Sequence, residues 1–237
     1  MNCTKKINLT GSHLKWIAII TMFIDHIGAA LLEQGILSKM AEYDFWYRFD
    51  HVLRAIGRLA FPLFCFLLVE GFQHTKNVKK YTLRLGLFAL ISEIPFDLAF
   101  NGKVLEVSYQ NVFFTLFLGL LTLIGLRYFK EKLPSHIVWL RFVVVLTGIV
   151  LAAYLRTDYG AFGVLLIFVL YECRNSKKLQ CIAGAVLMLF SSTTGCLAFL
   201  PVWFYNGERG KQLPKYFFYA FYPVHLCLLY VLRIMII

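Results

Sequence analysis

The chain has 237 residues, of which 59% are hydrophobic, 17% aromatic and only 16% charged. This composition lacks the polar surface of a soluble domain of that length, so it excludes an ordinary water-soluble enzyme and predicts an integral membrane protein. The formal net charge of +11 does not indicate a nucleic-acid partner, because the Lys and Arg residues lie in short clusters between apolar runs.

Eight apolar segments follow one another along the chain, at roughly residues 14–33, 52–73, 80–100, 111–129, 136–155, 159–173, 179–204 and 216–236. We therefore expect an all-α, polytopic membrane bundle of about eight transmembrane helices, formed by one domain over residues 1–237. The seventh segment contains Gly184, Gly195 and four consecutive hydroxyl residues at 191–194, so we expect it to be tilted or broken.

The positions of the cations predict an orientation. Alternate loops on one side carry clusters at 5–15, 76–84, 127–132 and 174–178, and the side richer in Lys and Arg is expected to be cytoplasmic. With eight crossings of the inner membrane, both termini would then lie on its cytoplasmic side. The loop with Arg209, Lys211 and Lys215 would lie outside, against this trend.

Several ionisable residues fall within the apolar segments. Asp25 and His26 lie past the middle of the first segment, where charge is costly in lipid and is by default a sign of function. Glu93 and Asp97 are four residues apart, so both carboxyl groups share one helical face. The same outer depth is predicted for Arg58, Asn111, Asp158 and His225. A shared polar cavity in the outer half of the bilayer would account for all of them.

Each of these residues alone also has a structural interpretation. Arg58 would form a buried ion pair with Asp25, or with Glu93 or Asp97, and a backbone carbonyl would satisfy His225. The aromatic cluster at 216–222 is typical of an interfacial belt. The number of polar groups at one depth favours a functional site.

Lys15 and His26 are eleven residues apart, so they share a helical face about 16 Å apart along the axis. A long substrate with an anionic head, such as an acyl-coenzyme A, would place its phosphates at Lys15 and its thioester at His26. Further cations on the same rim come from His74, Lys76 and Arg84.

Several motifs, in their order along the chain, resemble the TraX family of membrane proteins. They are IDHIG at 24–28, GRLAFPLFCFLLVEGFQHT at 57–75, KYTLRLGLFALISEIPFDL at 80–98, DYGAFGVL at 158–165, YNGERG at 205–210 and FYAFYPVHL at 218–226. That family is associated with N-terminal acetylation of pilin and is related to the membrane acyltransferases of acyltransferase family three. The spacing of Lys15 and His26 matches a signature of that wider group, a basic residue followed by ten residues and a histidine.

The resemblance implies a transmembrane acyltransferase that needs no metal. It would move an acetyl group from cytoplasmic acetyl-CoA, as co-substrate, to an amine or hydroxyl of a peptide or pilin N-terminus, a glycan or a lipid at the outer face. A histidine near its ordinary pKa of about 6.5 is suited to remove a proton from such an acceptor. His26 is therefore the expected base.

Roles for the other residues follow from this hypothesis. Asp25 is expected to pair with Arg58, and Glu93 or Asp97 to hold the acceptor or orient His26. Arg58, Asn111 or His225 would stabilise the oxyanion, and the sequence does not rank them. Asn111, Asp158, Asn206 and Arg209 are the expected acceptor-binding residues on the outer side.

Two other functions remain open at this point. A proton-coupled transporter of small molecules would also collect ionisable residues near the midplane, and an assembly subunit would use them to lock helices together. The sequence also leaves a homo-oligomer open.

Overall fold

The computed structural model describes residues 8–36, 43–133, 137–211, 214 and 216–236. Over these residues the chain is helical, without strands, which confirms the all-α class. The first half forms α1 (Gly11–His26), the π-helix η1 (Ile27–Ile36), α2 (Tyr43–Gly57), α3 (Ala60–His74), α4 (Val78–Asn101) and α5 (Val112–Lys132). The second half forms α6 (Ile137–Tyr154), α7 (Gly160–Glu172), η3 (Cys173–Asn175), α8 (Lys177–Leu189), η4 (Gly195–Ala198), α9 (Phe199–Trp203) and α10 (Phe217–Ile236).

The helices agree with a membrane protein. Four helical stretches among the described residues are long and apolar enough to cross a membrane, namely Gly11–Gly35, Asp44–His74, Val112–Lys132 and Phe217–Ile236. Exposed large apolar side chains cover the outside of the bundle, for example Leu90, Trp139 and Val224. A bundle with such a surface is stable only when lipid or detergent covers it.

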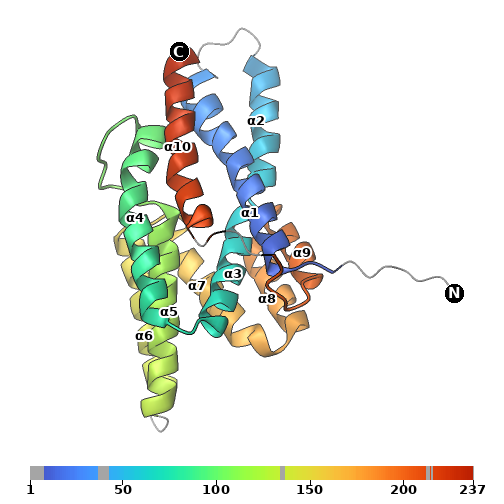
Figure 1. The fold of residues 1–237 in the computed structure, drawn as a ribbon, viewed down its shortest axis with the longest axis vertical. Helices are drawn as coiled ribbons and strands as arrows, with labels where there is room; N and C mark the ends of the chain where they lie inside the picture. Colours follow the sequence, from blue (N-terminus) through green and yellow to red (C-terminus); the bar gives the residue numbers. More distant parts are fainter. Residues whose placement is uncertain (1–7, 37–42, 134–136, 212–213, 215, 237) are drawn as a thin grey trace, which may run out of the picture.

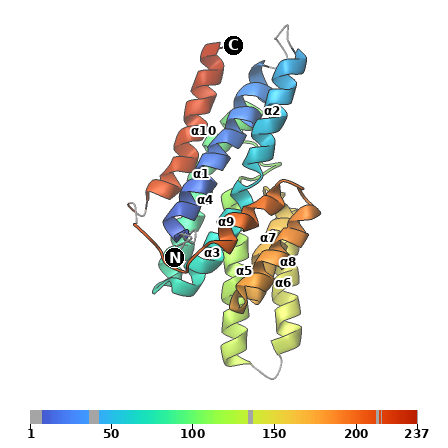
Figure 2. The ribbon, with the colours of Figure 1, turned by 90° about the vertical axis from the view of Figure 1, so that its right-hand side faces the viewer.

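The first and last helices run in the same direction, side by side (Figures 1 and 2). Trp16 near the start of α1 packs against Phe217 at the start of α10, with ring centroids 5.8 Å apart. Further along, Phe23 packs against Phe221 at 6.2 Å. The start of α1 and the end of α10 therefore lie at opposite ends of the bundle, whereas the eight crossings expected from the sequence would bring the first and last helices to the same end.

The cause lies in the seventh apolar segment, which turns back on itself instead of running from one end of the bundle to the other. It forms a hairpin of α8 with η4 and α9, in which η4 and α9 contact α3 and α8 packs against α7 (Figure 2). The Nζ atom of Lys177, at the start of α8, donates a hydrogen bond of 2.6 Å to the carbonyl of Tyr205, just after α9. Hydroxyl groups take over the backbone bonding at the turn, where Ser192 Oγ accepts the Gly195 N–H at 3.2 Å. The expected break is thus a complete reversal of the chain.

The reversal moves the segment after α9 to the end of the bundle where α1 begins. Leu9 N donates to the Phe204 carbonyl at 2.9 Å, Asn206 N donates to the Leu9 carbonyl at 2.9 Å, and Gly11 N donates to the Glu208 carbonyl at 2.8 Å. Asn206 and Arg209 therefore lie at the end of the bundle where α1 begins, and not at the end where α1 finishes, as the eight-span arrangement predicted.

We call the end where α1, α4, α8 and α10 begin the basic end. Arg209 and Lys211, in the segment after α9, lie at this end together with the other Lys and Arg clusters. The loop that ran against the predicted charge pattern therefore agrees with it. Lys5, Lys6 and Lys215 lie outside the described residues.

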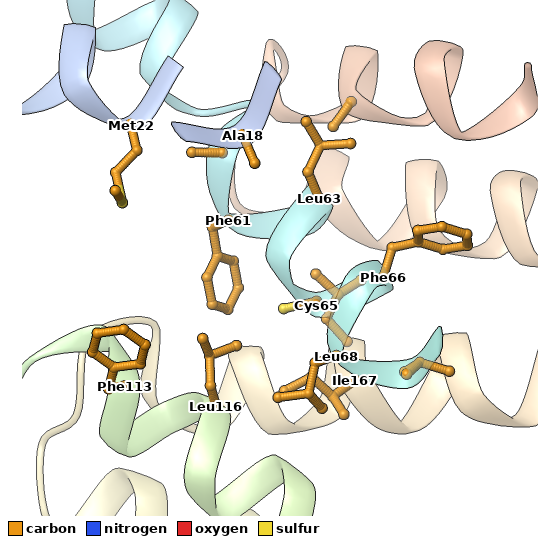
Figure 3. Close-up of a cluster of buried hydrophobic side chains, with 14 of the residues drawn as sticks. Ala18, Met22, Phe61, Leu63, Cys65, Phe66, Leu68, Phe113, Leu116 and Ile167 are labelled. Carbon is orange, nitrogen blue, oxygen red and sulfur yellow. The ribbon is translucent and has the colours of Figure 1, made fainter. Parts of the chain in front are cut away.

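Helix α3 lies at the centre of the core, between α1 on one side and α5 and α7 on the other (Figure 3). Its side chains Phe61, Leu63 and Phe66 are at most 3% exposed. They pack in one cluster with Met22 of α1 and Leu116 of α5. This packing holds α1 in a fixed position against the other half of the bundle, and α1 carries the first residues of the candidate site.

Candidate functional site

The two histidines of the site come from the parallel helices α1 and α10. Nδ1 of His26 lies 2.6 Å from Nε2 of His225. Nδ1 of His225 lies 2.7 Å from the carbonyl oxygen of Phe221. A carbonyl can only accept, so Nδ1 of His225 carries a proton and, in the neutral ring, its Nε2 is an acceptor. His26 then donates from Nδ1, which leaves its Nε2 with the lone pair of a base.

Aromatic rings enclose this pair. The two imidazoles are parallel within 6°, with centroids 4.9 Å apart. Phe100 of α4 meets the His26 ring edge-on at 5.5 Å, and Tyr222 of α10 does so at 5.7 Å. Because each ring is held by a neighbouring element, the orientation of His26 is set by α4 and α10 as well as by its own helix.

Asp25 turns away from the histidines towards α2. Its Oδ2 lies 2.6 Å from Nη1 of Arg54, and Nε of the same guanidinium lies 3.1 Å from Oε1 of Glu33. The predicted partner, Arg58, is thus the wrong one. Arg54 is one helical turn earlier than Arg58, before the break in the α2–α3 stretch, and the carboxylate approaches that turn over Gly57.

Arg58 lies on the other side of the break, next to the loop between α6 and α7. Its guanidinium is hydrogen-bonded to the Tyr159 hydroxyl, and Asp25 and Asp158 are its neighbouring carboxylates. Asp158 accepts a hydrogen bond of 2.8 Å from the Tyr109 hydroxyl. Burial raises the pKa of Asp158, although the bond from Tyr109 acts against this shift. These residues form one connected polar group.

The backbone around Tyr159 is strained. Its φ is 61° and that of Arg156 is 49°, both in the left-handed region that non-glycine residues rarely adopt. The loop is fixed by Gln110, whose N–H donates to the Arg156 carbonyl at 3.1 Å and whose carbonyl accepts the Asp158 N–H at 2.8 Å. Such strain persists only where the surroundings hold it, and it is common at functional sites.

The two carboxylates of α4 are both buried but have different partners. Glu93 Oε2 accepts hydrogen bonds from the side chain and the backbone N–H of Asn111, and its Oε1 is buried without a partner. Asp97 instead accepts the Glu106 N–H at 2.7 Å and the Asn101 side chain at 3.3 Å. Glu93 therefore has an unused acceptor, while Asp97 orders the loop between α4 and α5.

Helical regularity fails next to most of these residues. The π-helix η1 begins directly after His26, and the break between α2 and α3 follows Gly57. Pro62 has no N–H for the carbonyl of Arg58, and α4 and α10 contain Pro95 and Pro223, each two residues from a site residue. π segments and proline kinks are frequent at functional sites because they free backbone groups and re-aim side chains.

Two of the four cations predicted to bind coenzyme A flank the start of α10. Nζ of Lys15 lies 5.2 Å from the Phe218 ring centroid, and Arg84 is hydrogen-bonded to the Tyr219 hydroxyl. Nε of Arg84 is buried without a partner. Lys15 and His26 both contact α10, so they share a helical face, as the spacing of eleven predicted.

The other two cations lie further out at the basic end. His74 is half exposed and lies 3.6 Å from Glu70, while its carbonyl accepts a bond of 2.9 Å from Arg209. Lys76 is exposed.

Cavities lie at both ends of the described bundle. One of about 850 Å³ at the basic end is lined by α3, η3, α8, α9 and the segment after α9. The other, of about 520 Å³, is lined by Gln34, Asn101, Gly102, Arg233 and Ile234. Asn101 directly follows Phe100, whose ring touches His26. Among the described residues no three His, Cys, Asp or Glu side chains form a group that could hold a metal.

Comparison with known proteins identifies the family. The profile described as TraX protein matches residues 10–233, nearly the whole chain. The chain belongs to the TraX family. It is also 32% identical to the protein named "Probable fimbrial assembly protein FimC, serogroup H1" of Dichelobacter nodosus, over 95% of this chain and 96% of that protein. No solved structure matches.

Four residues that contact the predicted site residues could not be singled out before the structure was known, namely Arg54, Tyr109, Tyr159 and Tyr222. Arg54 shares a helical face with Arg58, four residues on, and this spacing was a usable signal. Tyr222 falls within the predicted interfacial belt but is 2% exposed, and its hydroxyl contacts the backbone of Val112. Composition cannot distinguish a tyrosine facing lipid headgroups from one facing a polar interior.

Proposed function

We propose that this TraX-family protein is a membrane-embedded acyltransferase, which takes an acetyl group from acetyl-CoA at the basic end and passes it to an acceptor from the opposite end. The observation that carries the proposal is the hydrogen-bonded series from the Phe221 carbonyl through His225 to His26, which leaves Nε2 of His26 as a base. The basic end is cytoplasmic in this proposal, because it collects the Lys and Arg clusters. The membrane is then the inner membrane, with α1 starting in the cytoplasm.

In the proposed reaction the acceptor amine or hydroxyl attacks the thioester carbonyl carbon while Nε2 of His26 removes its proton. The carbon–sulfur bond then breaks, and the thiolate of coenzyme A takes the proton back from His26. Nδ1 of His26 keeps its proton throughout and stays bonded to His225, so the ring does not turn during the reaction. A positioned base of this kind contributes about 10²–10⁴-fold to the rate.

The residues at the basic end fit the phosphates of an acyl-coenzyme A. The unpartnered Nε of Arg84 is a buried donor that a phosphate oxygen would satisfy, and Lys15 lies on the other side of the same turn of α10. From Lys15 the axial distance to His26 is about 16 Å, which an extended pantetheine arm spans. His74 and Lys76 would act only on the outer rim.

The contacts favour Arg58 as the group that stabilises the oxyanion. The side-chain amide of Asn111 already donates to Glu93 and, at 2.8 Å, to the Ala89 carbonyl. The proton of His225 is held by Phe221. Arg58 has five N–H donors, and its hydrogen bond to Tyr159 leaves others for an oxyanion.

The acceptor would enter through the cavity beside Phe100, which lies at the end opposite to the coenzyme. Asn111 and Asp158 lie with the polar group and keep their proposed role towards the acceptor, whereas Asn206 and Arg209 lie at the wrong end for it. The family and the fimbrial-assembly name of the relative support a pilus subunit as the acceptor.

The test uses purified protein in nanodiscs with radiolabelled acetyl-CoA and pilin peptides, glycans or lipids as acceptors. Label in a stable acceptor product, lost in His26→Ala, is the expected result. Uptake of an acceptor-like solute in proteoliposomes without any acyl donor, together with no labelled product, would instead support a transporter.

A further inference from the structure

The cavity at the basic end is separate from the histidine pair. Its wall on one side is α3, with Phe66 and Glu70, and on the other the ends of the hairpin, with Arg174, Lys177 and Trp203. Helix α3, whose core cluster packs against α1 (Figure 3), forms one wall of this cavity. The proposed transfer uses none of these side chains, so the cavity needs an explanation of its own.

Both signs of charge line the cavity. Lys177 donates one of its three N–H groups to the Tyr205 carbonyl, and Arg174 donates to the Tyr171 carbonyl while its guanidinium lies 3.8 Å from the Tyr171 ring centroid. Both cations keep further donors. Among the described residues that line the cavity, Glu70 of α3 is the one carboxylate.

Glu70 is held as an acceptor. Its side chain is 20% exposed, and its Oε2 accepts a bond of 3.2 Å from the Tyr205 hydroxyl. Burial and the nearby carboxylate raise the pKa of Tyr205 to about 12, so the hydroxyl stays protonated at neutral pH and can only donate to Glu70. The cavity thus offers cations and one anion at fixed places.

The mouth of the cavity adjoins the lipid-facing surface. Trp203 lines the cavity and is 46% exposed, and Leu200 and Leu197 precede it on the same side at 59% and 48%. Tryptophan is enriched where the hydrocarbon meets the headgroups. An exposed tryptophan at the mouth, continued by an apolar strip, is the surface expected of a site at headgroup depth.

We propose that this cavity binds the phosphoethanolamine headgroup of a membrane phospholipid. The phosphate lies against Arg174 and Lys177, the primary ammonium donates to Glu70, and the acyl chains follow Leu200 and Leu197. Basic pockets between helices on the cytoplasmic side commonly bind lipid phosphates. An anionic headgroup would leave Glu70 facing negative charge, and a choline headgroup has no N–H to donate. This inference does not depend on the acyl-transfer proposal.

The test measures lipid binding to the delipidated full chain by native mass spectrometry, with phosphatidylethanolamine and phosphatidylcholine of identical acyl chains. The wild type is expected to bind phosphatidylethanolamine at least about tenfold more tightly, since one hydrogen bond between charged groups separates the two lipids. Glu70→Gln should bring the ratio close to one. Arg174→Ala/Lys177→Ala should weaken both lipids, and Lys79→Ala, an exposed cation at the same end, should change neither.

Equal binding of the two lipids by the wild type, or an unchanged ratio in Glu70→Gln, would overturn the proposal. If Glu70→Gln fails to fold, the wild-type ratio and the Arg174→Ala/Lys177→Ala variant decide. Soluble glycerophosphoethanolamine that binds as tightly as the lipid would overturn the lipid as occupant. Displacement of the bound lipid by coenzyme A would overturn the site, because it would then belong to the nucleotide.

Discussion

Replacing Gly57 with alanine tests the contact between α1 and α2 beside the site. A Cβ atom at this position would lie 2.1 Å from Oδ1 of Asp25 and 2.2 Å from its Cβ. Both distances are far below van der Waals contact, and the short Asp side chain cannot move aside without leaving Arg54, 2.6 Å away. Gly57→Ala therefore either separates α1 from α2 or breaks the ion pair.

The cost follows from these two possibilities. Overpacking in a tight core costs about 1–3 kcal/mol, and loss of one partner of a buried ion pair costs about 3–5 kcal/mol. The pair is 19 to 23% exposed, so we take the lower part of that range. The higher helix propensity of alanine returns at most about 1 kcal/mol. We expect a net loss of about 2 kcal/mol, or a fall in Tm of about 4–8 °C for a chain of this size.

The assay is thermal unfolding in detergent, with Gly86→Ala as the matched control in α4. A Cβ at Gly86 would lie 3.1 Å from the edge of the Phe117 ring, which can turn, so its Tm should change by no more than about 3 °C. A Gly57→Ala protein that melts with the wild type and the control would refute the reasoning.

Three further changes test other parts of the site. His225→Phe keeps a flat ring but removes the acceptor for Nδ1 of His26. We therefore expect kcat to fall about 10–100-fold with little change in KM for acetyl-CoA, and an unchanged kcat would argue against the histidine pair. Asn111→Ala removes both the cap that accepts the Phe113 N–H at 3.0 Å and the partner of Glu93. The free energy of unfolding should therefore fall by about 2–3 kcal/mol in denaturant titrations, and a loss under about 0.5 kcal/mol would contradict this. Hydrogen bonds from Lys103 and Ser108 lower the pKa of Glu106 to about 2, so Glu106 stabilises the loop fully above the ordinary Glu pKa and loses this effect as the pH falls towards 2. Pepsin cleavage of the loop should therefore begin at a higher pH in Lys103→Ala than in the wild type. An identical pH profile of cleavage would count against the pair.

The helical segments could be predicted because hydrophobic runs of membrane length leave little choice of structure. Two contacts between predicted residues, His26 with His225 and Glu93 with Asn111, could also be expected, because depth in a helix follows from residue number at a fixed rise. His26, Glu93, Asn111, Asp158 and His225 could thus be assigned to one level.

The predictions that the structure contradicts depended on the direction of a helix or on its rotation about its own axis. The run from Leu179 to Phe204 is apolar enough for a span, and only its hydroxyl residues show that the chain turns back. That one reversal decides on which side Arg209 lies. Rotation is set by packing, so the choice between Arg54 and Arg58 as the partner of Asp25 depended on Gly57, whose missing side chain admits the carboxylate.

The central claim is that His26 is the base of an acyl transfer across the bundle. The most direct measurement is single-turnover acetyl transfer in sealed, oriented proteoliposomes, with radiolabelled acetyl-CoA on the side of the basic end and the acceptor on the other. We predict transfer by the wild type, and a loss of at least about 100-fold in His26→Ala of normal abundance and Tm. Full activity of that variant, or transfer only when acetyl-CoA is on the opposite side, would contradict the account.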